Sequence, residues 1–390
     1  MDLKVNTTRR RFMGGLAAAV GCRSLSSFGF PVQDRRQAPV NTSSVPADPV
    51  AEFDRMVKLA SNENPYGPSE AVMKVMNQVW KYSNRYGYPD GGIVEAIADH
   101  HGVKPENVLI GAGSAEILKA ADDAFLPDHR KVVGVEPTFE TVYRYATNSK
   151  AQAIAVALRP DYTADMKEII RVTRLNARDV GLVYICNPNN PTGNIVHKDD
   201  IKLLLESIPE EIPVLIDEAY HHFVENPNYE PSLKYVLQGR KVIVTRTFSK
   251  IAALAGMRLG YGIAPKEVID QMRPVIYGSS INALVKYGGA AALKDTAYEA
   301  KIRQLTRQVR GQTMAELKSL GYELIPSDTN FFMVNIKKDA AQAGAEFRKK
   351  GILVGRKFPP MDQWLRVSIG TADDMKRFLA AFKEICPVPK

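Results

Sequence analysis

The feature that most constrains the fold is a strand-like run that ends at a loop bearing a lysine. Residues Lys241–Thr245 form an apolar, β-branched run bounded by charge, which predicts a buried strand. The loop that follows contains Ser249, Lys250 and Arg258 and is punctuated by glycine. Open α/β sheets carry their reactive groups at the carboxyl ends of strands. The pattern therefore predicts an α/β fold with Lys250 at the carboxyl edge of a sheet.

Lys250 is the candidate reactive group. A lysine at such a position can have a lowered pKa and can form a Schiff base with a carbonyl compound. Ser249 and Arg258 add a hydroxyl group and a fixed cation, which together suit a phosphate. A lone Ser-Lys pair is more often an ordinary solvated loop. The assignment therefore depends on whether other segments supply matching groups.

The segment Thr247–Gly260 resembles a known lysine motif. It fits T-x-S-K-x-x-x-L-A-G-x-R-x-G, which is similar to the motif of histidinol-phosphate aminotransferases. These are class I/II aminotransferases of fold type I, which depend on pyridoxal 5′-phosphate (PLP). The resemblance implies a large domain with a mainly parallel seven-stranded sheet, a small α+β domain and a homodimer. It also implies that PLP is held at Lys250.

Three further segments carry the resemblance in the same order as in the family. They are Gly111–Glu116 (G-A-G-S-A-E), Asn187–Gly193 (N-P-N-N-P-T-G) and Asp217–Tyr220 (D-E-A-Y). Each comes at the end of an apolar run that predicts a strand. As turns these segments are generic, but as ordered strings they are specific to this aminotransferase group.

The resemblance assigns residues to the PLP phosphate. It implies that Ser114 and the Ala115 amide bind the phosphate together with Ser249 and Arg258. A glycine-rich turn that opens a helix has free N–H groups, which favour an anion. The string G-x-G-x-x-G is not completed and no P-loop lysine follows, so the segment is not a nucleotide fingerprint.

Other residues are assigned to the ring of PLP. Asp217 would keep the pyridine nitrogen protonated, which the cofactor needs to act as an electron sink. Asn190 and Tyr220 would hydrogen-bond the phenolic oxygen. Phe139 stands where the family usually has a stacking tyrosine; stacking survives the change, whereas a hydroxyl group is lost. The alternative for Phe139 is an ordinary core position.

A tyrosine from the partner subunit reaches the phosphate in this family. The loop Asn84–Gly91 corresponds to an R-Y-P stretch, and Tyr86 is the candidate because Arg85 precedes it. The insertion of Gly87 and Tyr88 before the proline departs from the pattern and leaves Tyr88 as a rival.

Three residues are assigned to the substrate. Arg366 resembles the arginine that binds the substrate carboxylate bidentately, and Asn64 lies in an N-E-N-P arm near the active site of the family. The histidinol-phosphate enzymes have an arginine directly after the strand that is predicted here at Gly351–Val354. Here Gly355 takes that place and Arg356 follows. A one-residue slip on an extended segment can turn a side chain to the other face.

The expected reaction is PLP-dependent transamination between an amino acid and a 2-oxo acid such as 2-oxoglutarate. The donor is expected to carry an aromatic, imidazole or anionic side chain, with histidinol phosphate the first compound to try. Because the motifs serve the cofactor, two alternatives stay open. One is a PLP-dependent decarboxylase or lyase on the same scaffold, and the other is a non-catalytic binding protein with the aminotransferase fold.

Composition excludes several other classes. A chain of 390 residues with 45% hydrophobic residues can bury a large core and suggests two domains. Three scattered cysteines do not make a disulfide framework or a zinc site, and no metal is expected. The net charge of +9 comes without a basic stripe interleaved with aromatics, so no nucleic-acid partner is expected. No apolar run approaches about 20 residues, so no membrane span is expected.

The first 48 residues are not expected to belong to the fold. Arg9 and Arg10 lie in a match to a twin-arginine export signal, with a cleavage site near residues 17–19 and a hint of lipid attachment at Cys22. A periplasmic location follows from this interpretation, and a disordered basic tail of a cytoplasmic protein is the alternative. The predicted domains are a signal and linker (1–48), an N-terminal arm (49–66), a large PLP-binding domain (67–284) and a small domain (285–390).

Overall fold

The computed structural model describes residues 49–127, 129–148, 151–276 and 281–387. The chain divides into two units, residues 1–52 and 53–390. Helix α1 (Pro49–Arg55) begins in the first unit, and all the other described helices and strands belong to the second. The predicted export signal and Cys22 lie outside the described residues.

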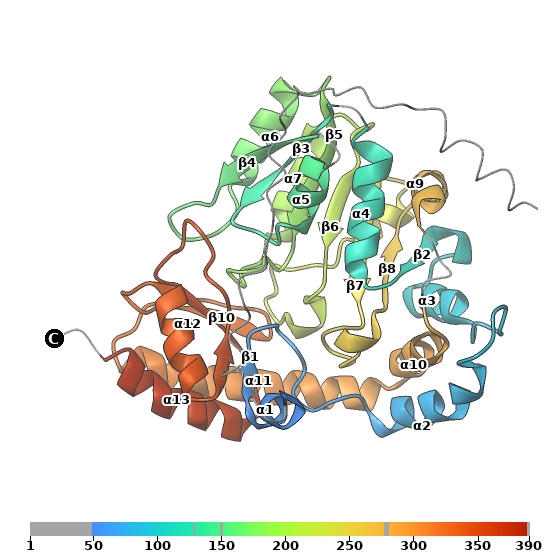
Figure 1. The fold of residues 1–390 in the computed structure, drawn as a ribbon. Helices are drawn as coiled ribbons and strands as arrows, with labels where there is room; N and C mark the ends of the chain where they lie inside the picture. The colour runs from blue at the N-terminus through green and yellow to red at the C-terminus, as the bar shows by residue number, and fades with distance from the viewer. Residues whose placement is uncertain (1–48, 128, 149–150, 277–280, 388–390) are drawn as a thin grey trace, which may run out of the picture. The chain divides into compact units, whose positions relative to one another are not determined.

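A seven-stranded sheet forms the centre of the second unit (Figure 1). Its strands lie in the spatial order β2 (Val108–Gly111), β8 (Gly260–Ile263), β7 (Val242–Thr247), β6 (Val214–Asp217), β5 (Val180–Cys186), β3 (Lys131–Glu136) and β4 (Gln152–Ala157). Neighbouring strands are parallel except where β8 pairs with β2 and β7. The expected mainly parallel seven-stranded sheet is confirmed.

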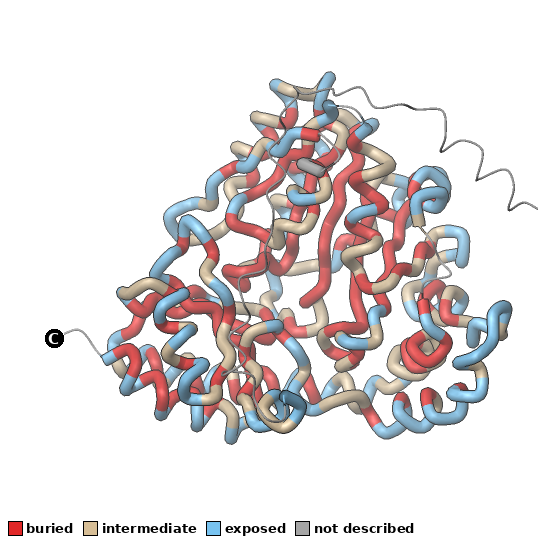
Figure 2. Tube along the Cα trace, viewed as in Figure 1, coloured by how far each residue is buried: buried red, intermediate tan, exposed pale blue. Residues whose placement is uncertain are grey.

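The central strands of this sheet, such as β6 and β7, are buried along their whole length (Figure 2), whereas the edge strand β4 is largely exposed. In β6, Val214 and Ile216 pack into one hydrophobic cluster, whereas Leu215 between them packs into the other. Successive side chains of a strand point to opposite faces, so a strand covered on both sides needs an unbroken apolar run. This explains the continuous apolar runs in the sequence.

Helices cover the two faces. One face is covered by α4 (Ser114–Phe125), α5 (Thr141–Asn148) and α9 (Lys266–Met272). The helices of the other cluster are α2 (Glu70–Val79), α3 (Ile93–His101), α6 (Met166–Leu175), α7 (Lys198–Ser207), α8 (Leu233–Leu237) and α10 (Ala283–Lys294). Short 3₁₀ turns connect some elements: η2 (Trp80–Tyr82), η3 (Pro105–Asn107), η4 (His221–Phe223), η5 (Ala255–Met257) and η6 (Arg273–Val275).

Two smaller sheets lie outside the central sheet. Strand β10 (Phe331–Asn335) pairs antiparallel with β12 (Trp364–Ser368) and β9 (Leu324–Ile325). Strand β1 (Val57–Leu59), in the predicted arm, pairs in parallel with β11 (Ile352–Val354). A separate core forms here with α12 (Ala340–Lys349) and α13 (Ala372–Ile385). The arm is therefore tied to the smaller part of the fold; the domain boundaries themselves stay a prediction.

One long helix links the two parts. In the structure α10 ends at Lys294, and α11 (Thr296–Ser319) runs on as a single helix of 24 residues. The Asp295 carboxylate accepts a hydrogen bond from the Tyr298 amide at 3.1 Å, so Asp295 caps the start of α11.

Asp122 of α4 makes the stability of the protein depend on pH. It is 0% exposed, and neither carboxylate oxygen has a hydrogen-bond partner among the described residues. Burial raises its pKa to about 9. The unfolded value is roughly 4, so the native state must hold a proton that the unfolded state releases, and stability falls as pH rises from about 4 to about 9.

Asp122→Asn is expected to stabilise the protein increasingly as pH rises, because the amide needs no proton. Between pH 5 and pH 8, the proton held by Asp122 can change the free energy of unfolding by at most roughly 4 kcal/mol. We expect Asp122→Asn to stabilise the protein by about 2 kcal/mol more at pH 8 than at pH 5. Urea unfolding at the two pH values measures this. Asp270→Asn, on an exposed carboxylate that pairs with Lys266, is the control. Parallel pH dependence in wild type and Asp122→Asn would contradict the assignment.

Candidate active site

The carboxyl ends of β5, β6 and β7 lie level with one another. Cys186, Asp217 and Thr245 are register partners across the three strands. The loops that leave these strands therefore emerge at one edge of the sheet, and they carry the motifs found in the sequence. A pocket of about 480 Å³ opens there, a size that suits a small ligand.

Six of the predicted residues line this pocket: Phe139, Asn190, Tyr220, Lys250, Arg356 and Arg366. Asp217 is buried at the end of β6, next to the pocket lining. Ser249 and Asn64 line an adjoining hollow of about 490 Å³. The structure thus brings most of the predicted site together from segments more than 200 residues apart in the sequence.

Lys250 points its amine into the pocket wall. The Nζ atom donates to the Ser61 carbonyl at 3.0 Å and lies 5.7 Å from the centre of the Tyr220 ring. Burial and the nearby Arg366 guanidinium lower its pKa to about 8. A larger fraction of this amine is uncharged at neutral pH than for a solvated lysine, as a nucleophile or base requires.

Asp217 supplies a buried carboxylate at the base of the site. Thr245 Oγ1 donates to Asp217 Oδ1 at 3.1 Å. Burial raises the pKa of this carboxyl to about 6, so it is mostly ionised at neutral pH. A buried carboxylate with one side-chain hydrogen bond is suited to a cationic ring nitrogen.

Asn62 is a site residue that the sequence interpretation missed. Its Nδ2 donates to the Tyr220 hydroxyl at 3.0 Å, and Asn190 Nδ2 lies 3.5 Å from the same oxygen. Asn62 has φ of 54°, a left-handed conformation that asparagine tolerates. The arm motif N-E-N contains two asparagines, and this backbone turn selects the first for the pocket.

Asn64, predicted to contact substrate, does not line the lysine pocket. Its Nδ2 donates to the Ile251 carbonyl at 2.9 Å and to the Tyr298 hydroxyl at 3.1 Å. The side chain therefore fastens the arm to the loop after Lys250 and to α11.

Arg366 is a buried cation with spare donors. Nη1 donates to Asn190 Oδ1 at 2.6 Å and Nη2 to the Ala60 carbonyl at 2.5 Å. Its Nε is buried without a partner among the described residues. Burial lowers its pKa to about 10, which still leaves it charged at neutral pH. A guanidinium has five N–H donors, so Arg366 can still bind a carboxylate.

The start of α4 forms a cradle next to Arg258. A Cβ at Gly113 would lie 2.0 Å from Arg258 Nη2, and one at Gly260 would lie 2.2 Å from the Ser114 amide nitrogen. Glycine is therefore required at both positions for the loop, the helix start and the guanidinium to come together. Gly113 also leaves the first-turn N–H groups of Ser114 and Ala115 without a side-chain cap.

Ser249 and Arg258 face this cradle together. Arg258 Nη1 lies 3.5 Å from Ser249 Oγ and donates to the Ala255 carbonyl at 2.8 Å. Arg258 has φ of 61°, a left-handed backbone conformation that is unfavourable for a residue with a side chain. A hydroxyl group, a guanidinium and the positive end of a helix converge here, as a phosphate requires.

The loop with two candidate tyrosines lies on the surface. Tyr86 is fully exposed. The Tyr88 hydroxyl donates to the Ile281 carbonyl at 2.9 Å, and its ring stacks on Tyr82 with centroids 6.3 Å apart. Tyr88 is therefore used within its own chain, whereas the Tyr86 side chain extends into solvent.

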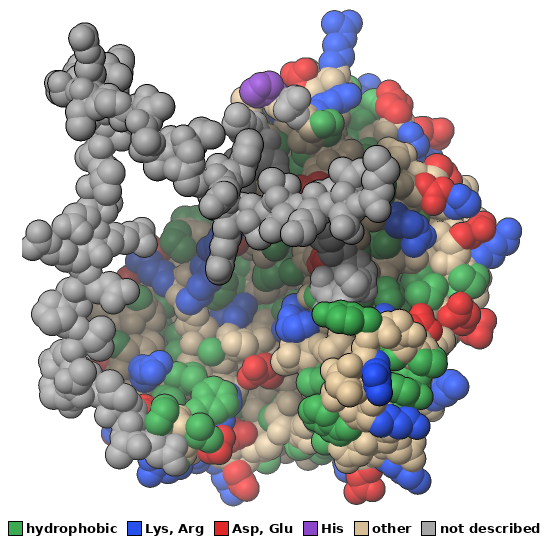
Figure 3. All heavy atoms as spheres, turned by 45° about the vertical axis from the view of Figure 1, so that its right-hand side comes forward, with side chains coloured by type: hydrophobic (Ala, Val, Ile, Leu, Met, Phe, Trp, Pro, Cys, Tyr) green, Lys and Arg blue, Asp and Glu red, His purple; other side chains and the backbone are tan. Residues whose placement is uncertain are grey.

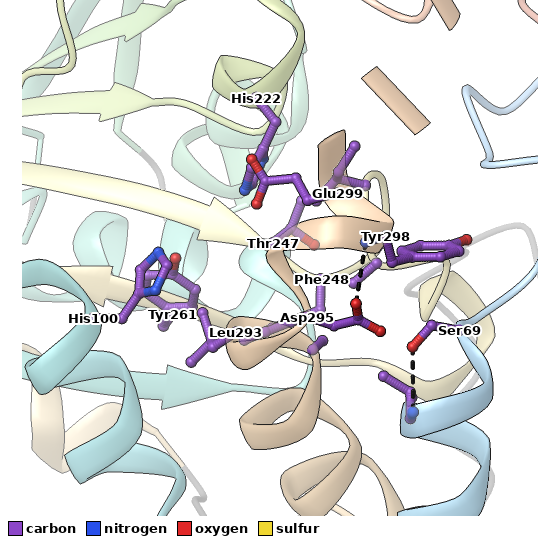
Figure 4. A pocket seen from close by; sticks show the side chains of 14 residues that line it. Ser69, His100, His222, Thr247, Phe248, Tyr261, Leu293, Asp295, Tyr298 and Glu299 are labelled. Atoms are coloured by element: carbon purple, nitrogen blue, oxygen red, sulfur yellow. Dashed lines mark hydrogen bonds between the residues drawn. The ribbon is translucent and has the colours of Figure 1, made fainter. Parts of the chain in front are cut away.

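A second, much smaller cavity lies beside the start of the lysine loop (Figure 4). Thr247 and Phe248 line it together with His222 and Glu299, which point toward one another in the figure. Its volume of about 30 Å³ accommodates roughly two water molecules, not an amino acid. This cavity is therefore excluded as the substrate site.

A buried polar network supports the same loop. Arg246 Nη2 and Glu218 Oε2 form an ion pair at 2.8 Å, and Arg246 Nη1 lies 3.3 Å from His101 Nδ1. Burial and Arg246 lower the pKa of His101 to about 3, so it is neutral. Because a buried pair is costly to break, the network fixes the last residues of β7 before Lys250.

The described part of the chain lacks two features that mark other protein classes. It holds no group of three or more histidine, cysteine, aspartate or glutamate side chains suited to a metal ion. None of its helices is long and apolar enough to cross a membrane. Acidic and basic side chains are interspersed on the face shown in Figure 3.

Comparison with known proteins identifies relatives over most of the chain. The family model for aminotransferase class I and II matches residues 54–382. The histidinol-phosphate aminotransferase of Moorella thermoacetica is 36% identical over 354 residues, which cover 87% of this chain and 90% of that protein.

Two solved structures show the same fold. The histidinol-phosphate aminotransferase from Sinorhizobium meliloti, in complex with PLP, is 24% identical with a TM-score of 0.78, covering 93% of this chain and 99% of that one. The L-threonine-O-3-phosphate decarboxylase from Porphyromonas gingivalis is 20% identical with a TM-score of 0.72, covering 84% and 99%. At such identities the likeness concerns the fold alone, and it spans more than one activity.

Proposed function

The chain belongs to the class I and II aminotransferases, and we propose that it moves an amino group from a donor with an imidazole, aromatic or anionic side chain to a 2-oxo acid such as 2-oxoglutarate. It is a PLP-dependent enzyme of fold type I. The observation that carries the proposal is one pocket in which Lys250 and Arg366 lie together, because transamination needs a base and a site for a carboxylate.

The residues present fit PLP. Gly113 and Gly260, where a Cβ would clash with its neighbours, leave room for a phosphate beside the start of α4. The buried Asp217 carboxylate can pair with a protonated ring nitrogen. The residues that would hold the cofactor are Ser114, Ala115, Ser249 and Arg258 for the phosphate, Asp217 for the ring nitrogen, Asn190 and Tyr220 for the phenolic oxygen, and Phe139 for the ring face. When bound, PLP supplies an electron sink for the bond broken at the donor α-carbon.

The chain's own residues perform the remaining tasks. Lys250 Nζ, with its pKa of about 8, takes the proton from the donor α-carbon and later returns it. The free donors of Arg366 bind the carboxylate of donor or acceptor and fix its orientation. Asn62 and Asn190 hold the Tyr220 hydroxyl in place at the pocket wall.

Histidinol phosphate is the first donor to test. A close relative carries that activity in its name, and two arginines, Arg356 and Arg366, lie in the pocket wall where an anion would enter. The test is an assay of glutamate formation from 2-oxoglutarate with each of four donors: histidinol phosphate, histidine, phenylalanine and aspartate. Donor consumption with release of carbon dioxide and no glutamate would favour the decarboxylase alternative instead. No reaction with any donor would overturn the proposal.

We also propose that the enzyme acts as a homodimer in which Tyr86 reaches the partner's cofactor phosphate. Its full exposure on an isolated chain supports this. Sedimentation measures the oligomeric state, and Tyr86→Phe is expected to weaken PLP retention on dialysis, whereas Tyr88→Phe is not. A monomer with full activity would contradict the proposal.

Export by the twin-arginine pathway is a further proposal, supported by the sequence around Arg9 and Arg10. We expect the mature protein in the periplasm, starting after roughly residue 19. Changing Arg9 and Arg10 to lysine should retain the protein in the cytoplasm. Cell fractionation with N-terminal sequencing measures both, and a full-length wild-type chain found in the cytosol alone would discard the proposal.

A further inference from the structure

An ion pair closes one side of the pocket mouth. Arg356 Nη2 lies 2.9 Å from Glu140 Oε1, and both side chains are partly exposed. Glu140 lies just before α5, in the loop that follows β3, whereas Arg356 lies just after β11. The pair therefore joins the two parts of the fold beside the pocket that holds Lys250.

Gly355 explains why the arginine lies where it does. The Gly355 amide donates to the Arg366 carbonyl at 2.9 Å, and a Cβ at Gly355 would lie 2.7 Å from that oxygen. The position directly after β11 therefore excludes any larger residue. The one-residue slip does not turn the arginine away, because Arg356 lines the pocket from the next position.

The Phe358 ring lies beside the guanidinium groups of both arginines in the pocket wall. Its ring lies 4.2 Å from the Arg356 guanidinium and 4.8 Å from the Arg366 guanidinium. Arg366 is buried among neutral groups, and its guanidinium donates hydrogen bonds to an amide oxygen and a backbone carbonyl. Arg356, in contrast, carries the Glu140 carboxylate as a counter-charge.

We propose that Glu140 is a specificity-determining residue, which neutralises Arg356 and so reduces the preference of the pocket for donors with an anionic side group. This inference rests on the proposed transamination. An anionic group that binds Arg356 must share the guanidinium with Glu140 or displace it, and it meets the repulsion of that carboxylate. A neutral donor leaves the ion pair intact. Glu140 thus widens the range of donors toward neutral side chains.

Glu140→Gln tests the proposal in the PLP-loaded enzyme. A unit charge a few ångströms from a partly exposed site changes affinity by roughly five- to tenfold. We therefore expect kcat/KM for aspartate, relative to phenylalanine, to rise about five- to tenfold, mainly through a lower KM for aspartate. An unchanged ratio would overturn the proposal.

Matched variants separate the ion pair from net charge. Glu136→Gln removes a carboxylate from the same small cavity beside Arg356, and Arg144→Gln removes the other ion-pair partner of Glu140. Neither should raise the ratio. In an Arg356→Ala background the effect of Glu140→Gln should be clearly smaller, because only the direct repulsion between Glu140 and the anion is then relieved; a double-mutant cycle measures the difference. A ratio that rises equally in Glu136→Gln or in the Arg356→Ala background would overturn the proposal.

Binding of unreactive acids decides the question without turnover. Calorimetry with succinate and with 3-phenylpropionate compares a second carboxylate with a neutral ring. We expect Glu140→Gln to tighten succinate binding about five- to tenfold and to leave 3-phenylpropionate unchanged. If no donor reacts, the transamination proposal fails while this measurement still stands. If donors react and both acids bind as in wild type, the role of Glu140 alone is rejected.

Discussion

Lys250→Ala is expected to lower kcat for transamination by more than about 10⁴-fold, because the variant loses both the nucleophilic amine and the base. The amine is the group whose pKa burial lowers to about 8 at the carboxyl edge of the sheet. Folding should be retained, since the residues around it, such as Tyr220 and Arg366, keep their own hydrogen bonds.

The measurement is single-turnover and steady-state kinetics with the best donor of the panel. Lys241→Ala, just before the amino end of the same strand β7, is the matched control and should retain near-wild-type rates. Borohydride treatment of the wild type, followed by peptide mass spectrometry, should find the reduced cofactor on Lys250. Full activity of Lys250→Ala without added amine would reject the assignment.

The parts of the site that follow strands were predictable from sequence. An apolar run that ends in a polar string marks both the strand and its carboxyl end, and parallel neighbours bring these ends together. Lys250 was found in this way, whereas Asp217 and Asn190 follow the same kind of run but were assigned by the family resemblance; the structure brings all three to one edge. The fold class followed from the same pattern together with the family motifs.

Other parts depend on contacts between distant segments, which a local pattern does not contain. The choice of Asn62 over Asn64 is made by a left-handed backbone turn and by Tyr220, 158 residues away. The place of Arg356 follows from the close approach of Gly355 to the neighbouring strand. Strand β8 was missed because its two glycines weaken the strand signal, although close packing on α4 requires Gly260.

Asp217→Asn is expected to separate activity from stability. Loss of the carboxylate removes the partner of a protonated ring nitrogen, so kcat should fall by about 10²-fold or more, roughly 3 kcal/mol in the barrier. Thr245 Oγ1 can still donate to the amide oxygen of asparagine, so the local geometry is preserved. Thr245→Val keeps the carboxylate and loses one hydrogen bond; it should lower kcat less than about tenfold.

The stability of the cofactor-free chain should change in the opposite direction. Burial raises the pKa of Asp217 to about 6, above the unfolded value of roughly 4, so the ionised group destabilises the fold once pH exceeds that unfolded value. Asparagine removes this cost. The folded and unfolded pKa values differ by about two units, so the gain in the free energy of unfolding is at most roughly 3 kcal/mol. Urea unfolding of the cofactor-free proteins at pH 8 measures the gain. A carboxylate with a purely structural role would lower stability when replaced and leave kcat unchanged, and that result would contradict the assignment of Asp217 to the cofactor.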